Sequence, residues 1–264
     1  MVCVKQVPDP DAPASTFRVD ETARRVVPPA GIPPVVNGFD LNATEAALRI
    51  KDARAGDAEI TVLSVGHAFV IEVIKKPLSM GADSLVLIED PAAASLDATA
   101  TVAVLTAAIR KAGPFDLVLC GRQASDWDNA HVPLGLAESL GVPCVTLARR
   151  IDAPKDGGRI RVERSLSDGY QVVETPPPSV VTVSNELGEP RYPTLRGIMA
   201  ATRKQPVRWG LADVGLTRDV LAPGLELERL FVPQRRLEAE IVKGEDEADA
   251  GRRLALRLRE AKLI

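Results

Sequence analysis

Short apolar runs alternate with stretches of helical periodicity through the first half of the chain. The helical stretches place apolar residues three and four positions apart, and glycine or proline separates them from the apolar runs. Such alternation predicts right-handed βαβ crossovers and a mostly parallel sheet. The predicted strands are Val2–Val7, Glu59–Val65, Ser84–Ile88 and Phe115–Cys120, and the predicted helices are Asp40–Arg54, Ala68–Met80, Leu96–Ala112 and Pro133–Leu140. We therefore expect an α/β protein with a doubly wound, mostly parallel sheet and helices on both faces.

Two hairpins are predicted outside this alternation. Phe17–Val19 and Arg25–Val27 are able to pair within a proline-rich excursion that follows the first strand. Ile160–Arg164 and Tyr170–Glu174 flank a Ser-Asp-Gly turn, and Asp-Gly favours the positive φ angles of a tight hairpin. The second hairpin is expected to extend the sheet, followed by a strand over Pro178–Ser184 and a helix from about Thr194.

The chain beyond residue 204 has a different character. It is aperiodic and rich in proline and glycine to Pro233, and it ends in a charged amphipathic helix over Glu245–Lys262. We expect an α/β nucleotide-binding domain over residues 1–204 and an extended tail with a C-terminal helical arm over residues 205–264. Two interpretations of the arm stay open: the helix docks on its own domain, or it embraces another chain.

Composition narrows the range of functions. The formal net charge is -3, and no basic stripe is interleaved with aromatic residues, so nucleic-acid binding is not expected. The three cysteines are odd in number and lie in apolar runs, which favours buried, reduced thiols. No apolar run approaches the ~18 residues that span a bilayer. The opening residues resemble neither a signal nor a transit segment, and we expect a cytoplasmic protein.

The sequence lacks the common catalytic fingerprints. It contains no G-x-G-x-x-G after the first strand, no P-loop, no H-E-x-x-H and no C-x-x-C. Its two histidines, His67 and His131, lie in predicted loops, where a histidine is more often solvated than catalytic. We expect a protein without acid–base chemistry of its own.

One loop is suited to a nucleotide. Open parallel sheets bind ligands at the carboxyl ends of their strands. At one such end the segment Gly121–Val132 carries small and polar residues from a predicted strand into a predicted helix. Free N–H groups at the start of a helix favour a phosphate. The alternative is a polar loop in which Asp128 or Asn129 caps the helix, and the residues alone leave both open.

Four segments resemble the beta subunits of electron-transfer flavoproteins. They are CVKQVPDP from Cys3, NGFDLNATEAALRIK from Asn37, DLVLCGRQASDWD from Asp116, and PSVVTVSNELGEPRYPTLRGIMAA from Pro178. The resemblance covers most of residues 2–204 and keeps its order. It implies a heterodimer with an alpha subunit that holds most of a redox-active FAD. It also implies an AMP in this subunit or, in electron-bifurcating relatives, a second FAD.

The resemblance assigns residues to the nucleotide site. The backbone of Cys3 and Val65 would meet the adenine, and the loop from Gly121 would hold the phosphate. The matching positions are Cys3, Asn37, Gly38, Phe39, Asp40, Val65, Gly121, Arg122, Gln123, Ala124, Ser125, Asp126, Asp128, Asn129, Ala130, His131 and Val132. The chain departs from the family pattern at Trp127, at His131 and at Gly188. An indole at position 127 would narrow the site or stack on a ring.

The resemblance also implies a docking loop. Leu187 matches an anchoring leucine that enters an apolar pocket of a dehydrogenase, and the loop continues through Glu189, Pro190, Arg191 and Tyr192. Ser165 stands where some members carry an acid that faces the partner. The expected function is electron transfer from acyl-CoA dehydrogenase-type flavoenzymes, through FAD, to a membrane quinone oxidoreductase.

Two alternatives stay open. One is a bifurcating subunit with its own FAD and an NADH site. The other is a stand-alone adenine-nucleotide-binding regulatory protein or an ATP-cleaving ligase, which the missing P-loop disfavours.

Overall fold

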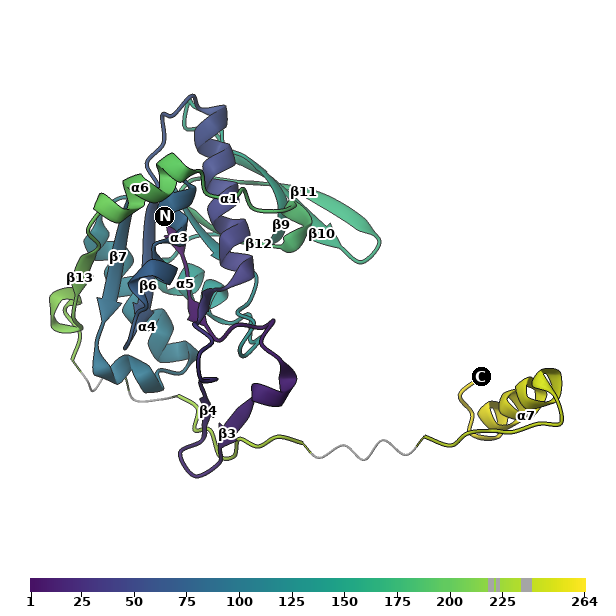
Figure 1. The fold of residues 1–264 in the computed structure, drawn as a ribbon. Helices are drawn as coiled ribbons and strands as arrows, with labels where there is room; N and C mark the ends of the chain where they lie inside the picture. The colour runs from purple at the N-terminus through teal and green to yellow at the C-terminus, as the bar shows by residue number, and fades with distance from the viewer. Residues whose placement is uncertain (218–220, 222–223, 234–238) are drawn as a thin grey trace.

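The computed structural model describes residues 1–217, 221, 224–233 and 239–264, and its centre is one twisted sheet (Figure 1). The strand order is β11-β10-β9-β12-β8-β1-β6-β7-β13. All neighbouring strands from β9 to β13 pair in parallel, whereas β10 and β11 add an antiparallel hairpin at one edge. The strands are β1 (Val2–Cys3), β6 (Thr61–Gly66), β7 (Ser84–Glu89), β8 (Leu117–Gly121), β9 (Cys144–Asp152), β10 (Ile160–Leu166), β11 (Gly169–Thr175), β12 (Ser179–Val183) and β13 (Val207–Trp209).

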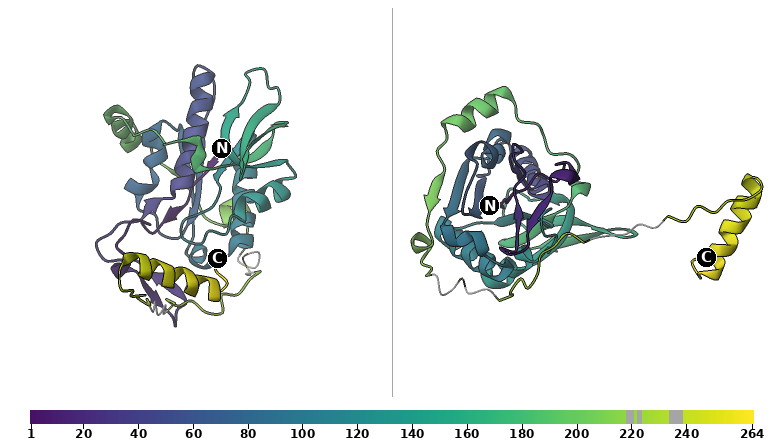
Figure 2. Two further views of the ribbon diagram at one scale, coloured as in Figure 1. Left: turned by 90° about the vertical axis from the view of Figure 1, so that its right-hand side faces the viewer. Right: turned by 60° about the horizontal axis from the view of Figure 1, so that its bottom comes forward.

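Helices cover both faces of the sheet, as the alternation predicts (Figure 2). Successive strand residues point to opposite faces, so Val62 and Leu63 of β6 enter separate apolar cores. One core is closed by α1 (Gly38–Ala53), α2 (Ile71–Ile74) and α3 (Lys76–Met80). The other is closed by α4 (Ala98–Ala112) and α5 (Val132–Leu140). The predicted α/β fold class is confirmed.

Several element boundaries differ from the prediction. The single strand expected over Val2–Val7 is wrong, because β1 ends at Cys3 and a separate β2 (Gln6–Val7) pairs antiparallel with β5 (Val35–Val36). The helix expected over Ala68–Met80 divides into α2 and α3 at Lys75, and Pro77 lies in the first turn of α3. The first predicted hairpin forms as β3 (Arg18–Asp20) and β4 (Arg25–Val27). The second forms as β10 and β11.

The body of the protein extends past residue 204. After α6 (Leu195–Arg203), β13 pairs with β7, and Leu211 is buried beneath it. Residues 207–209 of the expected tail therefore join the sheet. The backbone N–H groups of Gly224 and Leu225 then donate to Asp97. The predicted tail also includes residues 218–220, 222–223 and 234–238, which lie outside the described residues.

The C-terminal helix α7 (Glu247–Glu260) has no buried residue within the described part of the chain. Its apolar side chains include Leu254 and Leu256, both about half exposed. Among the helices that the structure describes, none combines the length and the apolar character that a bilayer crossing needs.

The first turn of α1 crosses the end of β8 at very close range. The Asp40 carboxylate accepts the backbone N–H of Lys5 at 2.7 Å and that of Gly121 at 3.1 Å. A methyl group on Gly121 would lie only 2.7 Å from the Phe39 Cβ and would also collide with the Asp40 carboxylate. Glycine at position 121 therefore permits the contact that joins α1 to β1 and β8.

Substitution of Gly121 by alanine tests this close approach. We expect Gly121→Ala to lower the free energy of unfolding by roughly 1–3 kcal/mol, since overpacking moves backbone rather than a flexible side chain. The control is Gly38→Ala, because a methyl group there meets open space. Denaturant titration of both variants measures the difference, and equal stability of the two would contradict the crowding at Gly121.

Burial raises the pKa of Asp40 to about 7, although the N–H donors of Lys5 and Gly121 oppose the shift. The unfolded chain therefore ionises this carboxyl at a lower pH than the folded protein does. Between about pH 4 and 7 the raised pKa lowers the stability of the fold progressively, by on the order of 4 kcal/mol in total.

We expect Asp40→Asn to remove this part of the pH dependence. The substitution lowers the free energy of unfolding by an amount that does not depend on pH, because the amide NH₂ meets an N–H donor. The slope of the free energy of unfolding against pH is therefore the measured quantity. Relative to the Asn variant, the native protein should lose stability as pH rises from 4 to 7. Asp57→Asn, at an exposed position, serves as the control. Parallel slopes for the native protein and Asp40→Asn would show that Asp40 titrates normally.

Candidate functional site

The segment Gly121–Val132 lies at the point where the strand order reverses. From β1 the chain proceeds to β6 and β7 on one side, and it then returns to β8 on the other side of β1. All four strands are parallel, so their carboxyl ends meet at one edge of the sheet. Ligands of open α/β sheets bind in the crevice at such a reversal. The structure thus brings Cys3 at the end of β1 beside the loop that follows β8.

Asn37 holds this loop in place. The residue is fully buried, and its side-chain amide donates to the Gln123 carbonyl at 2.8 Å while accepting the Ser125 N–H at 3.2 Å. Lys5 forms an ion pair of 2.6 Å with Asp126 at the outer side of the loop. Asn37 and Asp40, both expected to bind the nucleotide, have their side chains occupied by backbone groups. They shape the site.

Two residues of the loop adopt left-handed backbone conformations. Asp128 and Ala130 both have φ of 52°. An alanine in this region costs on the order of 1 kcal/mol, so the surrounding contacts must fix the loop shape. Strained residues of this kind occur at ligand sites, although Arg24 and Ala55 show that ordinary turns of this chain adopt the same conformation.

The start of α5 has no side-chain cap among the described residues. His131 is the N-cap residue and makes no capping hydrogen bond. The Asp128 carboxylate, one of the two candidate caps, accepts instead from the Gln123 side chain at 2.8 Å. The capping alternative is therefore not realised. Because Pro133 has no N–H, the N–H groups of Val132 and Leu134 are the ones that remain available to an anion.

Two buried polar atoms beside the loop lack partners in the described part of the chain. They are the Ser125 hydroxyl and the Nε of Arg122. The Arg122 guanidinium lies 5.0 Å from the centre of the Phe39 ring. An unpaired buried polar group costs free energy, and both atoms are donors that phosphate oxygens accept. The residues present therefore fit a phosphate-bearing group.

The remaining predicted site residues differ in exposure. The Cys3 and Cys120 side chains are buried in the sheet, and hydrogen bonding to Cys3, together with burial, raises the pKa of Cys120. Cys3 thus offers a ligand its backbone alone. Val65 near the carboxyl end of β6, Ala124 in the loop and Val132 at the start of α5 are half-buried. The exposed residues are Gly38, Asn129 and Ala130. Trp127 is 51% exposed, so its ring does not fill the site.

The docking loop differs from expectation at its anchor. Leu187 is only 7% exposed and packs into the core beside α1, so the expectation of an exposed leucine is wrong at this position. The exposed apolar residues lie further along the chain. Tyr192 is 93% exposed and Leu195 is 75% exposed, and Ile198 and Met199 are about half exposed. The sequence analysis missed this helical face because polar residues flank it. The spacing of Leu195, Ile198 and Met199 nevertheless places them on one side of a helix.

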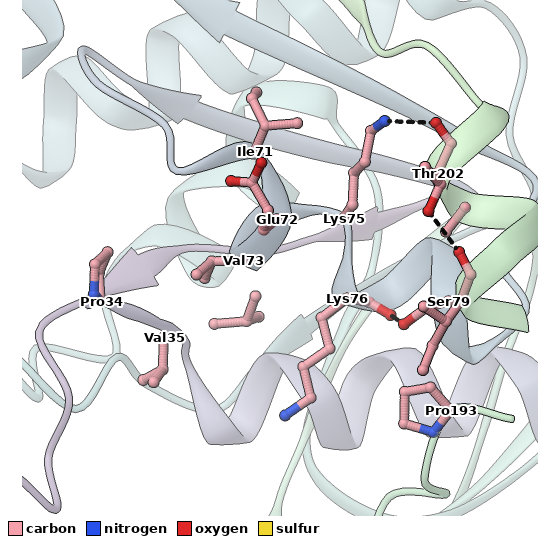
Figure 3. A pocket seen from close by; sticks show the side chains of 13 residues that line it. Pro34, Val35, Ile71, Glu72, Val73, Lys75, Lys76, Ser79, Pro193 and Thr202 are labelled. Carbon is pink, nitrogen blue, oxygen red and sulfur yellow. Dashed lines mark hydrogen bonds between the residues drawn. The ribbon is translucent and has the colours of Figure 1, made fainter. Parts of the chain in front are cut away.

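A cavity of about 460 Å³ lies beside this face, between β5, α2, α3 and α6 (Figure 3). Ile71, Val73, Pro193 and Ile198 contribute apolar walls, and Lys75 and Lys76 also line it. The exposed face of α6 is thus continuous with a recess.

Sequence reasoning also missed a row of polar side chains on α1. Asn42, Glu45, Arg49 and Asp52 recur at intervals of three, four and three residues, which places them on one helical face. Each of them bonds, directly or through a neighbour, to the segment Leu187–Arg191. The spacing of these four residues was visible in the sequence, but the segment that they bind was not.

Comparison with known proteins agrees with these features. The electron transfer flavoprotein domain model matches residues 26–214. The electron transfer flavoprotein subunit beta of Megasphaera elsdenii is 37% identical over 94% of this chain and 92% of its own length. The caffeyl-CoA reductase-Etf complex subunit CarD of Acetobacterium woodii is 34% identical over 100% and 99%. Protein FixA of Azorhizobium caulinodans is 34% identical over 90% and 85%.

The matched domain includes the loop after β8, the buried Asn37 and Asp40 that shape it, and the face of α6. The relatives are matched over almost their whole length, so the likeness extends beyond a shared sheet. This chain belongs to the electron-transfer flavoprotein beta subunit family.

Proposed function

We propose that this chain is the beta subunit of a heterodimeric electron carrier without substrate chemistry of its own. Its electrons come from an acyl-CoA dehydrogenase-type flavoenzyme, and they pass through FAD held mainly by the alpha subunit to a membrane quinone oxidoreductase. The heterodimer works in the cytoplasm and does not bind nucleic acid. FAD supplies the electron-carrying chemistry when it is bound, and this chain supplies binding surfaces.

The observation that carries the docking part of this proposal is the apolar face of α6. Tyr192 and Leu195 are mostly exposed and lie next to Ile198 and Met199. Large apolar side chains that gather on an exposed face mark interaction sites, and aromatic residues are frequent hot spots. Glu189, Pro190 and Arg191 lead into this face, and Leu195 replaces the buried Leu187 as the proposed anchor.

The loop Gly121–Val132 is the proposed nucleotide site. Its first α5 N–H groups, the Ser125 hydroxyl and Arg122 would hold the phosphate of AMP, while Asn37 and Asp40 keep the loop and β8 in register. The backbone at Cys3 and Val65 would contact the adenine. The fit rests on the uncapped start of α5 and on the two unpartnered buried donors.

The relatives support the class of redox partner. CarD is named as a subunit of a complex with caffeyl-CoA reductase, an enzyme named for a CoA thioester. We extend that class of partner to this chain. The alpha subunit is the proposed contact of α7, whose apolar side chains are not buried by the described residues of its own chain.

A second candidate function is an electron-bifurcating subunit with its own FAD. Trp127, where bifurcating relatives tend to have glycine, counts against this candidate, but the indole is 51% exposed and does not fill the loop. The identity of the nucleotide released from the purified heterodimer distinguishes this candidate from the AMP-binding carrier.

Substitution of Leu195 by alanine tests the docking face. With the complete heterodimer, we expect Leu195→Ala to raise the apparent KM for a reduced acyl-CoA dehydrogenase-type enzyme about tenfold, as hot-spot truncations do. Flavin content should not change, because the side chain projects outward. The change in flavin absorbance on mixing the two proteins measures the transfer.

Leu225→Ala provides the matched control, since this leucine has a similar exposure, 71%, but lies outside the α6 face. An unchanged KM for Leu195→Ala would remove α6 from the docking surface. Failure of the native heterodimer to accept electrons from any such flavoenzyme would refute the proposed function.

A further inference from the structure

The segment Leu187–Arg191 is fastened to α1 by side chains of one helical face. Asn42 donates to the Gly188 carbonyl at 2.9 Å, and Arg49 donates to the Leu187 carbonyl at 2.8 Å. Arg191 reaches back to the same face and donates to Asp52 at 2.8 Å. We call this set of contacts the α1 latch; it consists of Asn42, Glu45, Arg49, Asp52 and Arg191.

Glu45 is the centre of the α1 latch. Its carboxylate accepts the Arg191 backbone N–H at 3.2 Å and two guanidinium N–H groups of Arg191 at 2.8 and 3.2 Å. It also accepts the Arg49 Nε at 2.9 Å. Burial alone would raise the pKa of Glu45, but these donors from Arg191 and Arg49 lower it below its ordinary value. The carboxylate therefore remains ionised at neutral pH.

The Glu45 side chain is only 6% exposed. Buried, hydrogen-bonded charges add little net stability compared with apolar packing, and their best-attested use is to fix one geometry. The geometry fixed here is that of the segment immediately before Tyr192 and α6. Gly188, with φ of 100°, lets this segment turn sharply between the two carbonyls that the α1 latch holds.

We propose that Glu45 is a positioning residue for partner docking. It orients Arg191, and thereby the segment Leu187–Tyr192, so that the apolar face of α6 meets the redox partner in one orientation. The inference rests on the proposed function. Because Glu45 is buried, it does not contact the partner directly, and it acts on docking through the α1 latch.

The test compares Glu45→Gln with Lys51→Gln in the complete heterodimer. Lys51 lies on the same helix and loses an ion pair with Asp83 at 2.6 Å, which is partly exposed and does not involve the docking segment. For each variant we measure the apparent KM for the reduced flavoenzyme, the flavin content, the rate of flavin reduction by dithionite, and amide hydrogen exchange over residues 186–193.

We expect Glu45→Gln to raise the apparent KM about tenfold and to accelerate exchange over residues 186–193. Flavin content and dithionite reduction should match the native protein, and Lys51→Gln should leave all four quantities unchanged. The double variant Glu45→Gln/Arg191→Gln should raise the KM no more than the larger of the two single substitutions does, because both break the Glu45–Arg191 ion pair.

Two results would overturn the inference. In the first, Glu45→Gln leaves the KM unchanged while Leu195→Ala raises it. This result would support α6 as the docking face and refute the positioning role of Glu45. In the second, Glu45→Gln lowers flavin content and electron transfer to the same extent as Lys51→Gln, which would indicate a general loss of stability. Absence of electron transfer by the native heterodimer is a separate result, because it refutes the proposed function itself.

Discussion

The contact between the first turn of α1 and the end of β8 fixes the position of almost every other feature. Asp40 joins backbone N–H groups of Lys5 and Gly121, and the missing side chain at Gly121 lets the two elements approach. The contact costs free energy, since the Asp40 carboxyl is buried and burial raises its pKa to about 7. The protein tolerates this cost where β1, β8 and α1 converge, which is the crevice at the reversal of strand order.

From this contact α1 serves two sites along its length. At its start, Asn37 binds the backbone of the loop after β8, and that loop keeps two left-handed residues and an uncapped helix start. Further along, the α1 latch binds the segment that leads to α6. One rigid helix therefore sets the relative position of the proposed nucleotide loop and the proposed docking face. The sheet supplies the platform for both.

The fold class was predictable because parallel strands buried on both faces leave continuous apolar runs, as in Ser84–Ile88. β9 and β13 were not predicted. β9 contains Arg149 and Arg150, which interrupt its apolar pattern although it pairs with a strand on each side, and β13 is a three-residue strand at the sheet edge. These strands form because they pair with a neighbouring strand of the sheet, and the hydrophobic pattern of their own residues does not predict this pairing.

The site was predictable to a similar extent. The loop from Gly121 was recognisable from its small residues after a strand, and its nucleotide remains a proposal. The role of Asn37 and Asp40 was not predictable, because Gln123 and Gly121, which they bind, lie 86 and 81 residues away in the chain. Leu187 and Leu195 look alike in sequence, and tertiary packing alone decides which is buried. The α1 latch required knowledge of which segment crosses α1.

The most direct test of the central claim is the identity of the cofactors in the purified complex. This chain is co-expressed with its alpha subunit, the complex is denatured, and the released small molecules are identified and quantified by mass spectrometry. We expect FAD and AMP in equal amounts. Two FAD molecules per heterodimer and no AMP would instead support the bifurcating candidate. A chain that forms no complex and retains no flavin would contradict the account.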